Sequence, residues 1–262
     1  VLVECGTYCE RDILMKSGVC LKSEADSPKC ITIDAQLQGS VIICNTNDSS
    51  TKIECITMTN ASEGAMRISH SYVVVNNCTM KNNEGANGTA VDIWQSAPQF
   101  NNCLFYANQS THAPFAWTVM IAIGTDIPTF SNCTFAENSA GIGFVYDAAA
   151  YIDNCIIAFC TDGPAVGGDE GAYPIFSCSN LFGNVGDDWI CQDNCFSTDP
   201  EFCGVFGTGN YYLQSDSPCA PGNHPDGVDC GLIGALPVEC GTVATKKSTW
   251  GSMKSRFREE GQ

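Results

Sequence analysis

Short apolar runs alternate with polar or glycine-rich turns along the first 240 residues. One such stretch reads Tyr72–Val75, then Met80, then a polar segment over 82–88, then Val91–Trp94. Each unit of this kind predicts about three short strands separated by turns. The 3.6-residue periodicity of long helices is missing from this part of the chain, which disfavours a helical solenoid or an α/β barrel.

A short motif recurs along the same region and marks the length of one structural repeat. Asn76-Asn77-Cys78-Thr79-Met80 returns in altered form around Cys103, Cys133, Cys155 and, more weakly, Cys178, with cysteine spacings of 25, 30, 22 and 23 residues. Cys55 extends the series backward by 23 residues. A period in the twenties is too short for repeats of paired helices and fits one coil of a β-solenoid.

Equivalent residues of successive coils should stack at the strand spacing of about 4.8 Å. We therefore expect the asparagines to face inward at a corner and hydrogen-bond to the next coil, while the cysteines fill the space beside them. Cys55 belongs to the expected column of thiols. The expected buried ladder consists of Asn77, Cys78, Asn102, Cys103, Asn132, Cys133, Asn154, Cys155 and Cys178.

The chain divides into three segments by composition. Residues 1–188 carry the repeats, residues 189–240 are rich in cysteine and proline, and residues 241–262 are basic. An uncovered solenoid end is a template for edge-to-edge aggregation, so both ends need a cover. The second segment has too many prolines for central strands and is expected to be a disulfide-linked closing cap. The start of the chain, without an initiator methionine, is expected to result from processing or trimming.

The 18 cysteines of the 262-residue chain indicate an oxidising environment and a secreted, extracellular or cell-surface protein. No Cys-x-x-Cys pair occurs and only three histidines are present, which disfavours zinc, iron–sulfur and c-type haem sites. The cysteines outside the repeats cluster near the two ends and are candidates for disulfides: Cys5, Cys9, Cys20, Cys30, Cys44, Cys191, Cys195, Cys203, Cys219, Cys230 and Cys240.

The negative charge is unevenly distributed. The whole chain carries −17, whereas residues 1–240 hold 7 Lys and Arg against 27 Asp and Glu, which gives 7 − 27 = −20. Such an acidic body disfavours binding to nucleic acid and docking on anionic lipid. The sequence also has no run of 18 apolar residues, so no membrane span is expected.

The closing segment carries a family resemblance. Asp199-Pro200-x-Phe202-Cys203, Ser217-Pro218-Cys219 and Cys230-Gly231-Leu232-Ile233-Gly234-Ala235 follow coils of the Asn-Cys-x-Phe type. Together with the opening Val-Glu-Cys-Gly-Thr-Tyr, these elements resemble the secreted bacterial right-handed parallel β-helix repeat proteins of the pectate-lyase-like superfamily. The resemblance covers nearly all of residues 1–240. It implies an all-β fold, a right-handed parallel β-helix or β-solenoid, and implies little about activity.

The polysaccharide-cleaving enzymes of that superfamily use motifs that this sequence mostly lacks. Gly-His-Gly and Arg-x-Lys are absent, and only Asp187-Asp188 matches, within a turn where solvated carboxylates are common. No catalytic residue is therefore assigned, and the balance is against an enzyme. Acidic loops over 162–171 and 223–229 offer oxygen ligands, so a bound Ca²⁺ is retained as an alternative to the expected absence of a cofactor.

The basic tail has the pattern of a short amphipathic helix. Trp250, Met253 and Phe257 would share one face, and a helix this short needs a docking partner to be stable in water. Three interpretations are open: a cap on its own solenoid, a clasp on the acidic body of the next subunit, or an export or attachment signal. The residues assigned to docking are Lys246, Lys247, Trp250, Met253, Lys254, Arg256, Phe257 and Arg258.

Two functions from different classes follow. The first is a structural subunit that self-associates head to tail into a surface fibre or filament, with the basic tail of one copy on the acidic body of the next. The second is a polysaccharide-binding or polysaccharide-cleaving protein. Exposed aromatic residues would favour the second function, and the candidates are Tyr106, Trp117, Tyr146 and Trp189.

Overall fold

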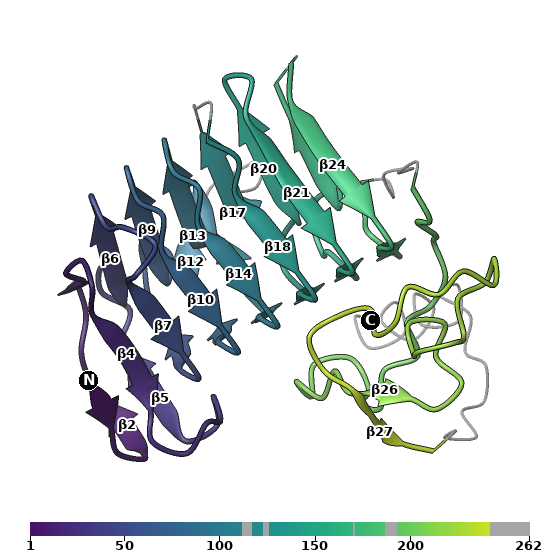
Figure 1. Cartoon of the computed structure of the whole chain (residues 1–262), viewed down its shortest axis with the longest axis horizontal. Coiled ribbons are helices and arrows are strands. Elements are labelled where there is room, and N and C mark those ends of the chain that lie inside the picture. Colours follow the sequence, from purple (N-terminus) through teal and green to yellow (C-terminus); the bar gives the residue numbers. More distant parts are fainter. Residues whose placement is uncertain (112–116, 123–125, 170, 187–192, 242–262) are drawn as a thin grey trace, which may run out of the picture.

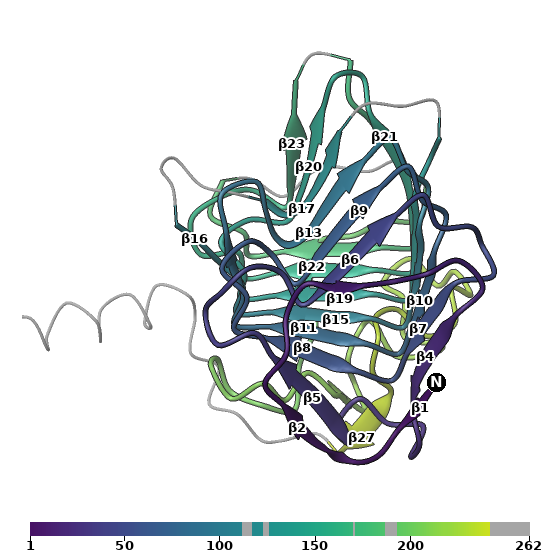
Figure 2. The ribbon, with the colours of Figure 1, turned by 90° about the vertical axis from the view of Figure 1, so that its left-hand side faces the viewer.

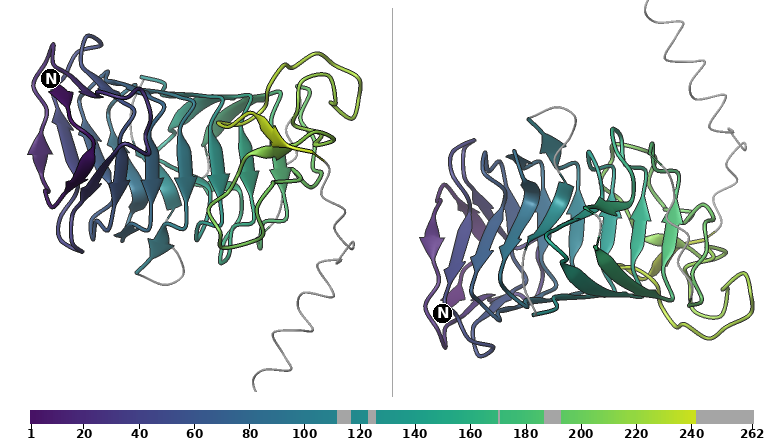
Figure 3. Two further views of the ribbon diagram at one scale, coloured as in Figure 1. Left: turned by 90° about the horizontal axis from the view of Figure 1, so that it is seen from below. Right: turned by 90° about the horizontal axis from the view of Figure 1, so that it is seen from above.

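The computed structural model describes residues 1–111, 117–122, 126–169, 171–186 and 193–241. It is a parallel β-solenoid in which three long sheets form the three sides of a rod (Figures 1 and 2). The coils follow one another along the long axis from the N-terminus, and residues 193–240 lie at the other end (Figure 3). The predicted all-β parallel β-helix is confirmed.

Neighbouring coils contribute one strand each to every long sheet, and all the pairings in these sheets are parallel. Sheet A contains β1 (Leu2–Val3), β4 (Cys20–Ser23), β7 (Lys52–Glu54), β10 (Val74–Asn76), β14 (Gln99–Asn101), β18 (Thr129–Ser131), β21 (Ala149–Asp153) and β24 (Tyr173–Ser177). Sheet B contains β2 (Gly6–Tyr8), β5 (Ile31–Asp34), β8 (Thr57–Thr59), β11 (Thr79–Lys81), β15 (Leu104–Tyr106), β19 (Thr134–Ala136), β22 (Ile156–Ala158) and β25 (Asn180–Phe182).

Sheet C closes the rod and contains β3 (Ile13–Leu14), β6 (Ile42–Asn45), β9 (Met66–Ser69), β13 (Gly88–Trp94), β17 (Trp117–Ala122), β20 (Ile142–Val145) and β23 (Val166–Gly168). Two small sheets pair β12 (Glu84–Gly85) with β16 (Gln109–Ser110) and β26 (Leu213–Gln214) with β27 (Val238–Cys240). The chain runs from sheet A through sheet B to sheet C in each coil.

The core is filled by columns of identical or similar side chains. Phe100 and Phe130 stack with ring centroids 5.0 Å apart, and Phe105 and Phe135 stack at 4.4 Å. All four rings are fully buried. The columns arise because residues paired in register on parallel strands lie one strand spacing apart and point in the same direction.

The predicted column of thiols runs along the inside of the corner between sheets A and B. Cys78, Cys103, Cys133 and Cys155 are buried, and each thiol lies near a backbone carbonyl of the preceding coil. Burial raises the pKa of Cys78 and of Cys133 well above the ordinary thiol value. These two thiols are therefore protonated and inert at neutral pH.

Two cysteines assigned to this column sit one residue away from it. Register places Ile56 and Ser179 in the thiol positions of their coils, which leaves Cys55 and Cys178 in the preceding corner position. The Ser179 hydroxyl makes the contacts of a ladder thiol, since it lies 3.5 Å from the Ile152 carbonyl oxygen. The sequence motif had therefore aligned Cys55 and Cys178 with the ladder cysteines, whereas the residues that follow them, Ile56 and Ser179, occupy the ladder positions.

The asparagines of the motif do not form the expected buried ladder. Asn77 and Asn102 are exposed, and Asn132 and Asn154 are half-buried. All four have φ near +51°, so each turns the chain from sheet A into sheet B in the left-handed conformation that asparagine tolerates. Cys55 and Cys178 adopt the same conformation, with φ of 58° and 45°. We call these six positions the corner column.

A buried asparagine ladder exists at the opposite end of sheet B. Asn83 donates from Nδ2 to Asn108 Oδ1, and Asn108 donates to Asn138 Oδ1, each at 2.9 Å. Asn108 Oδ1 also accepts the backbone N–H of Asn83 at 3.1 Å, and its Nδ2 donates to the Met80 carbonyl. The predicted interaction is therefore present, but in different asparagines, because it is needed where the turn leaves buried backbone groups unpaired.

Replacement of Asn108 by alanine should lower the free energy of unfolding by roughly 2–4 kcal/mol, because buried donors and acceptors of Asn83 and Met80 lose their partners. The matched control in the same coil is Asn102→Gly, which removes an exposed side chain and keeps a left-handed backbone. Urea unfolding of the two variants measures the difference. Equal losses would show that the ladder does not stabilise the solenoid.

Candidate functional site

The outer face of sheet B is covered by residues 193–240, which we call the cap. The cap first adds bridges from Asp193 and Phe196 to the last coil and then folds back along the rod. Ile156 and Ala158 pack against Leu213 and Ile233 of the cap. The expected closing cap therefore covers a side of the solenoid in addition to extending its end.

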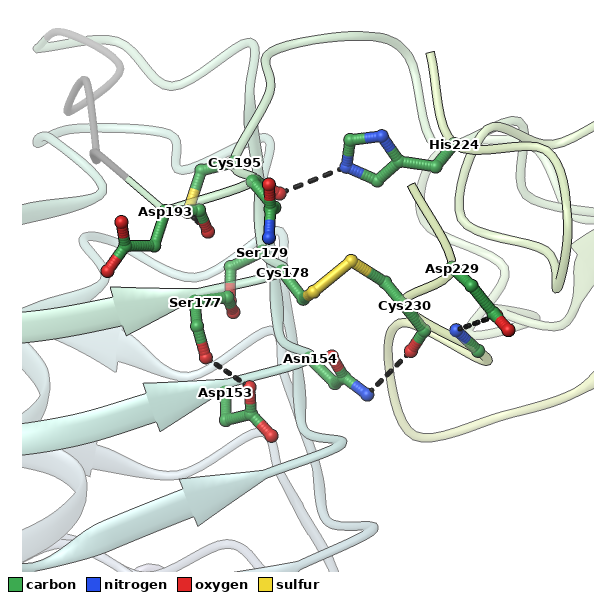
Figure 4. The surroundings of a disulfide bond; sticks show 12 residues. Asp153, Asn154, Ser177, Cys178, Ser179, Asp193, Cys195, His224, Asp229 and Cys230 are labelled. Carbon is green, nitrogen blue, oxygen red and sulfur yellow. Dashed lines mark hydrogen bonds between the residues drawn. A yellow bond between two sulfur atoms is a disulfide. The ribbon is translucent and has the colours of Figure 1, made fainter. Parts of the chain in front are cut away.

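The corner column holds a short part of the cap, residues 230–235, which we call the strap. Asn154 donates from Nδ2 to the Cys230 carbonyl at 3.0 Å, and Asn132 donates to the Leu232 carbonyl at 2.6 Å. Cys178 forms a disulfide with Cys230 (Figure 4). Cys178 was expected in the buried ladder, but at a corner position its side chain points outward and reaches the strap.

Some of the other disulfide candidates form disulfide bonds, and others carry free thiols. Cys5 is bonded to Cys30, Cys203 is bonded to Cys240, and Cys195 is also disulfide-bonded. The expectation of disulfides is wrong for Cys9, Cys20, Cys44 and Cys219, which carry thiols. Cys44 and Cys219 are buried in the cores of solenoid and cap, and burial raises the pKa of each to about 12. Cys191 lies outside the described residues.

Glu137 lies beneath the cap and ties it to the solenoid. Its carboxylate accepts the backbone N–H of Gly207, with N–O distances of 2.8 and 3.0 Å to the two oxygens, and the residue is 7% exposed. Burial raises the pKa of Glu137. Burial also raises the pKa of Tyr211, and the negative charge of Glu137 raises it further. Sheet B is therefore closed to external ligands along this part of the rod.

A row of exposed aromatic side chains lies where sheets C and A meet, on strands of the two sheets and on the turns that join them. We call this row the aromatic edge. Its members are between 41% and 70% exposed, which is unusual for large aromatic residues in a folded chain. They are Tyr72, Trp94, Tyr146, Tyr151 and Tyr173.

Strand register explains how residues from different coils form one surface. Trp94 at the end of β13 pairs with Ala122 of β17, and Ala122 pairs with Val145, the residue before Tyr146. The alanine leaves room for the rings on either side, and Trp94 and Tyr146 meet edge to face with centroids 6.5 Å apart. Each of these rings therefore limits the rotation of the other while remaining open to solvent.

The remaining members extend the edge along the axis and onto sheet A. Tyr173 pairs with Ala149, and Tyr151 pairs with Ile175, so the two tyrosines are diagonal neighbours on the outer face. At the other end, the Tyr72 hydroxyl donates to Asp126 Oδ2 at 2.9 Å, and this bond raises the pKa of Tyr72. Four coil steps separate Tyr72 from Tyr173, which corresponds to about 19 Å.

The four aromatic residues named from the sequence lie in different environments in the structure. Tyr146 belongs to the aromatic edge, whereas Tyr106 packs against Tyr211 of the cap. Trp117 lies half-buried across Gly143 and Gly167, where an added Cβ would come within 2.1 and 2.6 Å of the indole. Trp189 lies outside the described residues, as do Asp187-Asp188 and all the tail residues assigned to docking.

Within the described parts of the chain, no three His, Cys, Asp or Glu side chains are grouped as metal ligands would be. Ca²⁺ binding remains a prediction from the acidic loops. The described residues also contain no helix long and apolar enough to cross a membrane.

Comparison with known proteins identifies the fold but no family. No family model matches the sequence, and no curated protein matches it. Among solved structures, pectate lyase Pel9A superposes with a TM-score of 0.55 at 12% sequence identity, over 91% of this chain and 87% of that protein. This likeness agrees with the resemblance to pectate-lyase-like β-helices and concerns the fold alone.

The raised pKa of Glu137 predicts a pH-dependent stability. The folded protein binds this proton more tightly than the unfolded chain, so rising pH lowers stability between the ordinary and the raised pKa. Glu137→Gln should remove this slope, and its stability relative to wild type should increase as the pH rises above the ordinary glutamate pKa. Urea unfolding across this range measures the effect, with the exposed Glu239→Gln as control. Parallel curves for wild type and Glu137→Gln would contradict it.

Proposed function

We propose that this protein is an extracellular polysaccharide-binding β-solenoid that holds an uncharged glycan on the aromatic edge. The observation that carries the proposal is the exposed row of aromatic side chains along the junction of sheets C and A. Aromatic rings offer apolar faces to the C–H faces of sugars, and their hydroxyl and indole N–H groups remain available for hydrogen bonds. Exposed apolar groups gathered in this way are typical of binding surfaces.

Several features support a glycan rather than a protein partner or a small molecule. The edge is long and narrow, and polar residues lie among its rings, including Gln95, Gln99 and Asp126. An extended chain of sugars matches a row of about 19 Å better than a compact ligand does. The disulfides support an extracellular location, where polysaccharides are accessible.

The charge of the body supports an uncharged ligand. Residues 1–240 carry 27 acidic and 7 basic side chains, and Asp126 contacts a member of the edge directly. A uronate polymer would be repelled by this field unless cations bridged the two. The pectate lyase that shares the fold acts on pectate, so we infer that the likeness in fold does not extend to the charge of the ligand.

The alternative role as a fibre subunit depends on the basic tail. Residues 242–262 lie outside the described part of the chain, so head-to-tail assembly stays a prediction. Size-exclusion chromatography with and without these residues tests it, and a monomer in both forms would count against assembly.

Binding to a neutral β-glucan or xylan should be detectable by affinity electrophoresis and weakened about tenfold or more by Trp94→Ala or Tyr146→Ala, because each removes a stacking surface. The matched control is Phe206→Ala, which removes an equally exposed aromatic ring from the cap. If the glycan slowed the migration of all three variants equally, the proposal would be wrong. Depolymerisation of the glycan would instead identify an enzyme.

The same experiment with polygalacturonate tests the charge argument. We expect no binding at low salt in the presence of a chelator, because both partners are anionic. Retention of polygalacturonate that Trp94→Ala abolishes would show that the edge accepts acidic sugars and would contradict the assignment of an uncharged ligand.

A further inference from the structure

Three cysteines occupy equivalent positions in the first three coils. Gly6 pairs with Ile31, which places the preceding residues Cys5 and Cys30 side by side. Thr32 of β5 pairs with Thr57 of β8, and Cys30 and Cys55 each lie two residues before these partners, in the turns that lead into the two strands. Cys5, Cys30 and Cys55 therefore form a row along the corner between sheets A and B.

Cys30 has a potential disulfide partner on each side. It is bonded to Cys5, with the two Cα atoms 4.7 Å apart. Cys55 lies in the next coil, and neighbouring parallel strands are about 4.8 Å apart. Cα separations from about 4.4 to 6.8 Å are compatible with a disulfide. The spacing that allows the existing bond thus allows a bond from Cys30 to Cys55 as well.

Cys55 carries a thiol and is 3% exposed. Burial raises its pKa, the negative charges of Asp26 and Glu54 raise it further, and the positive charge of Lys22 lowers it. Lys22 is itself ion-paired with Asp26 at 2.6 Å and with Glu54 at 3.7 Å. The reactive thiolate is therefore scarce at neutral pH and becomes more abundant as the pH rises.

We propose that Cys5, Cys30 and Cys55 form a site of intramolecular thiol–disulfide exchange. The thiolate of Cys55 attacks Sγ of Cys30, the Cys30–Cys55 bond forms, and the Cys5–Cys30 bond breaks. The electron pair leaves on Sγ of Cys5, which takes up the proton that Cys55 lost. One disulfide and one thiol are present before and after the step, so no external oxidant or reductant is required.

The exchange moves a crosslink from the first pair of coils to the second. Residues 1–14 contain no buried residue, and Met15 is the first buried side chain of the chain. The Cys5–Cys30 bond therefore adds a covalent tie between the first coil and the rod, beside the backbone hydrogen bonds and the packing of the partly buried Val3, Tyr8 and Ile13. When the bond moves to Cys55, strand β2 loses its covalent link to the next coil and keeps its hydrogen bonds to β5, while Cys5, which is exposed, gains a thiol.

The Cys5→Ser variant tests the geometry directly. Because Cys30 then has only one neighbour in the row, the folded variant should form a Cys30–Cys55 disulfide under mild oxidation. Alkylation at low pH followed by non-reducing peptide mapping identifies the bond, and far-UV circular dichroism checks the fold. If Cys30 and Cys55 are both alkylated in a folded Cys5→Ser variant, the proposal is wrong.

The wild-type protein provides a second measurement that does not depend on the folding of the variant. Incubation at about pH 9, where a larger fraction of Cys55 is ionised, should convert a detectable share of Cys5–Cys30 into Cys30–Cys55 within hours. Cys55→Ser is the matched control and should retain Cys5–Cys30 alone. Absence of the Cys30–Cys55 peptide from the wild type after this incubation would overturn the proposal.

Discussion

In-register stacking of parallel strands is the constraint on which the rest of this structure depends. Residues that pair across two coils point the same way and lie about 4.8 Å apart, so any interaction at one position can be repeated in the next coil. The stacked phenylalanines and the asparagine ladder of Asn83, Asn108 and Asn138 follow from this rule. The aromatic edge follows as well, since its members come from different coils and are brought together by register.

Much of the architecture could be predicted from the sequence because the repeat of the Asn-Cys motif reports the length of a coil. The same motif misled the assignment of individual residues. Asn77 and Asn83 both follow a short apolar strand, and only the direction of the backbone decides which amide faces the core. A shift of one residue at Cys178 separates a buried ladder position from a disulfide, and a single sequence offers no alignment fine enough to detect it.

The candidate site was harder to predict than the fold for a related reason. Tyr146 could be named as an exposed aromatic residue, but Tyr72, Trp94, Tyr151 and Tyr173 were missed. The spacing between coils varies from 22 to 30 residues, so the turns have unequal lengths and the register across them cannot be read from the sequence. The cap was recognised by its cysteines and prolines, whereas its packing on sheet B depends on Leu213, which no motif marks, and on Ile233, whose motif gives no sign of the face that it contacts.

The corner column shows how one backbone requirement can serve several purposes. Each of its positions needs a residue that tolerates a left-handed conformation, and all of its side chains except that of Cys55 are exposed or half-buried. Asparagine fastens the strap there and cysteine provides a covalent link, while Asn77 and Asn102 remain exposed. The exposed members of the column are therefore regularly spaced attachment points. Chemical groups could be attached to them in a line along the rod without repacking the interior.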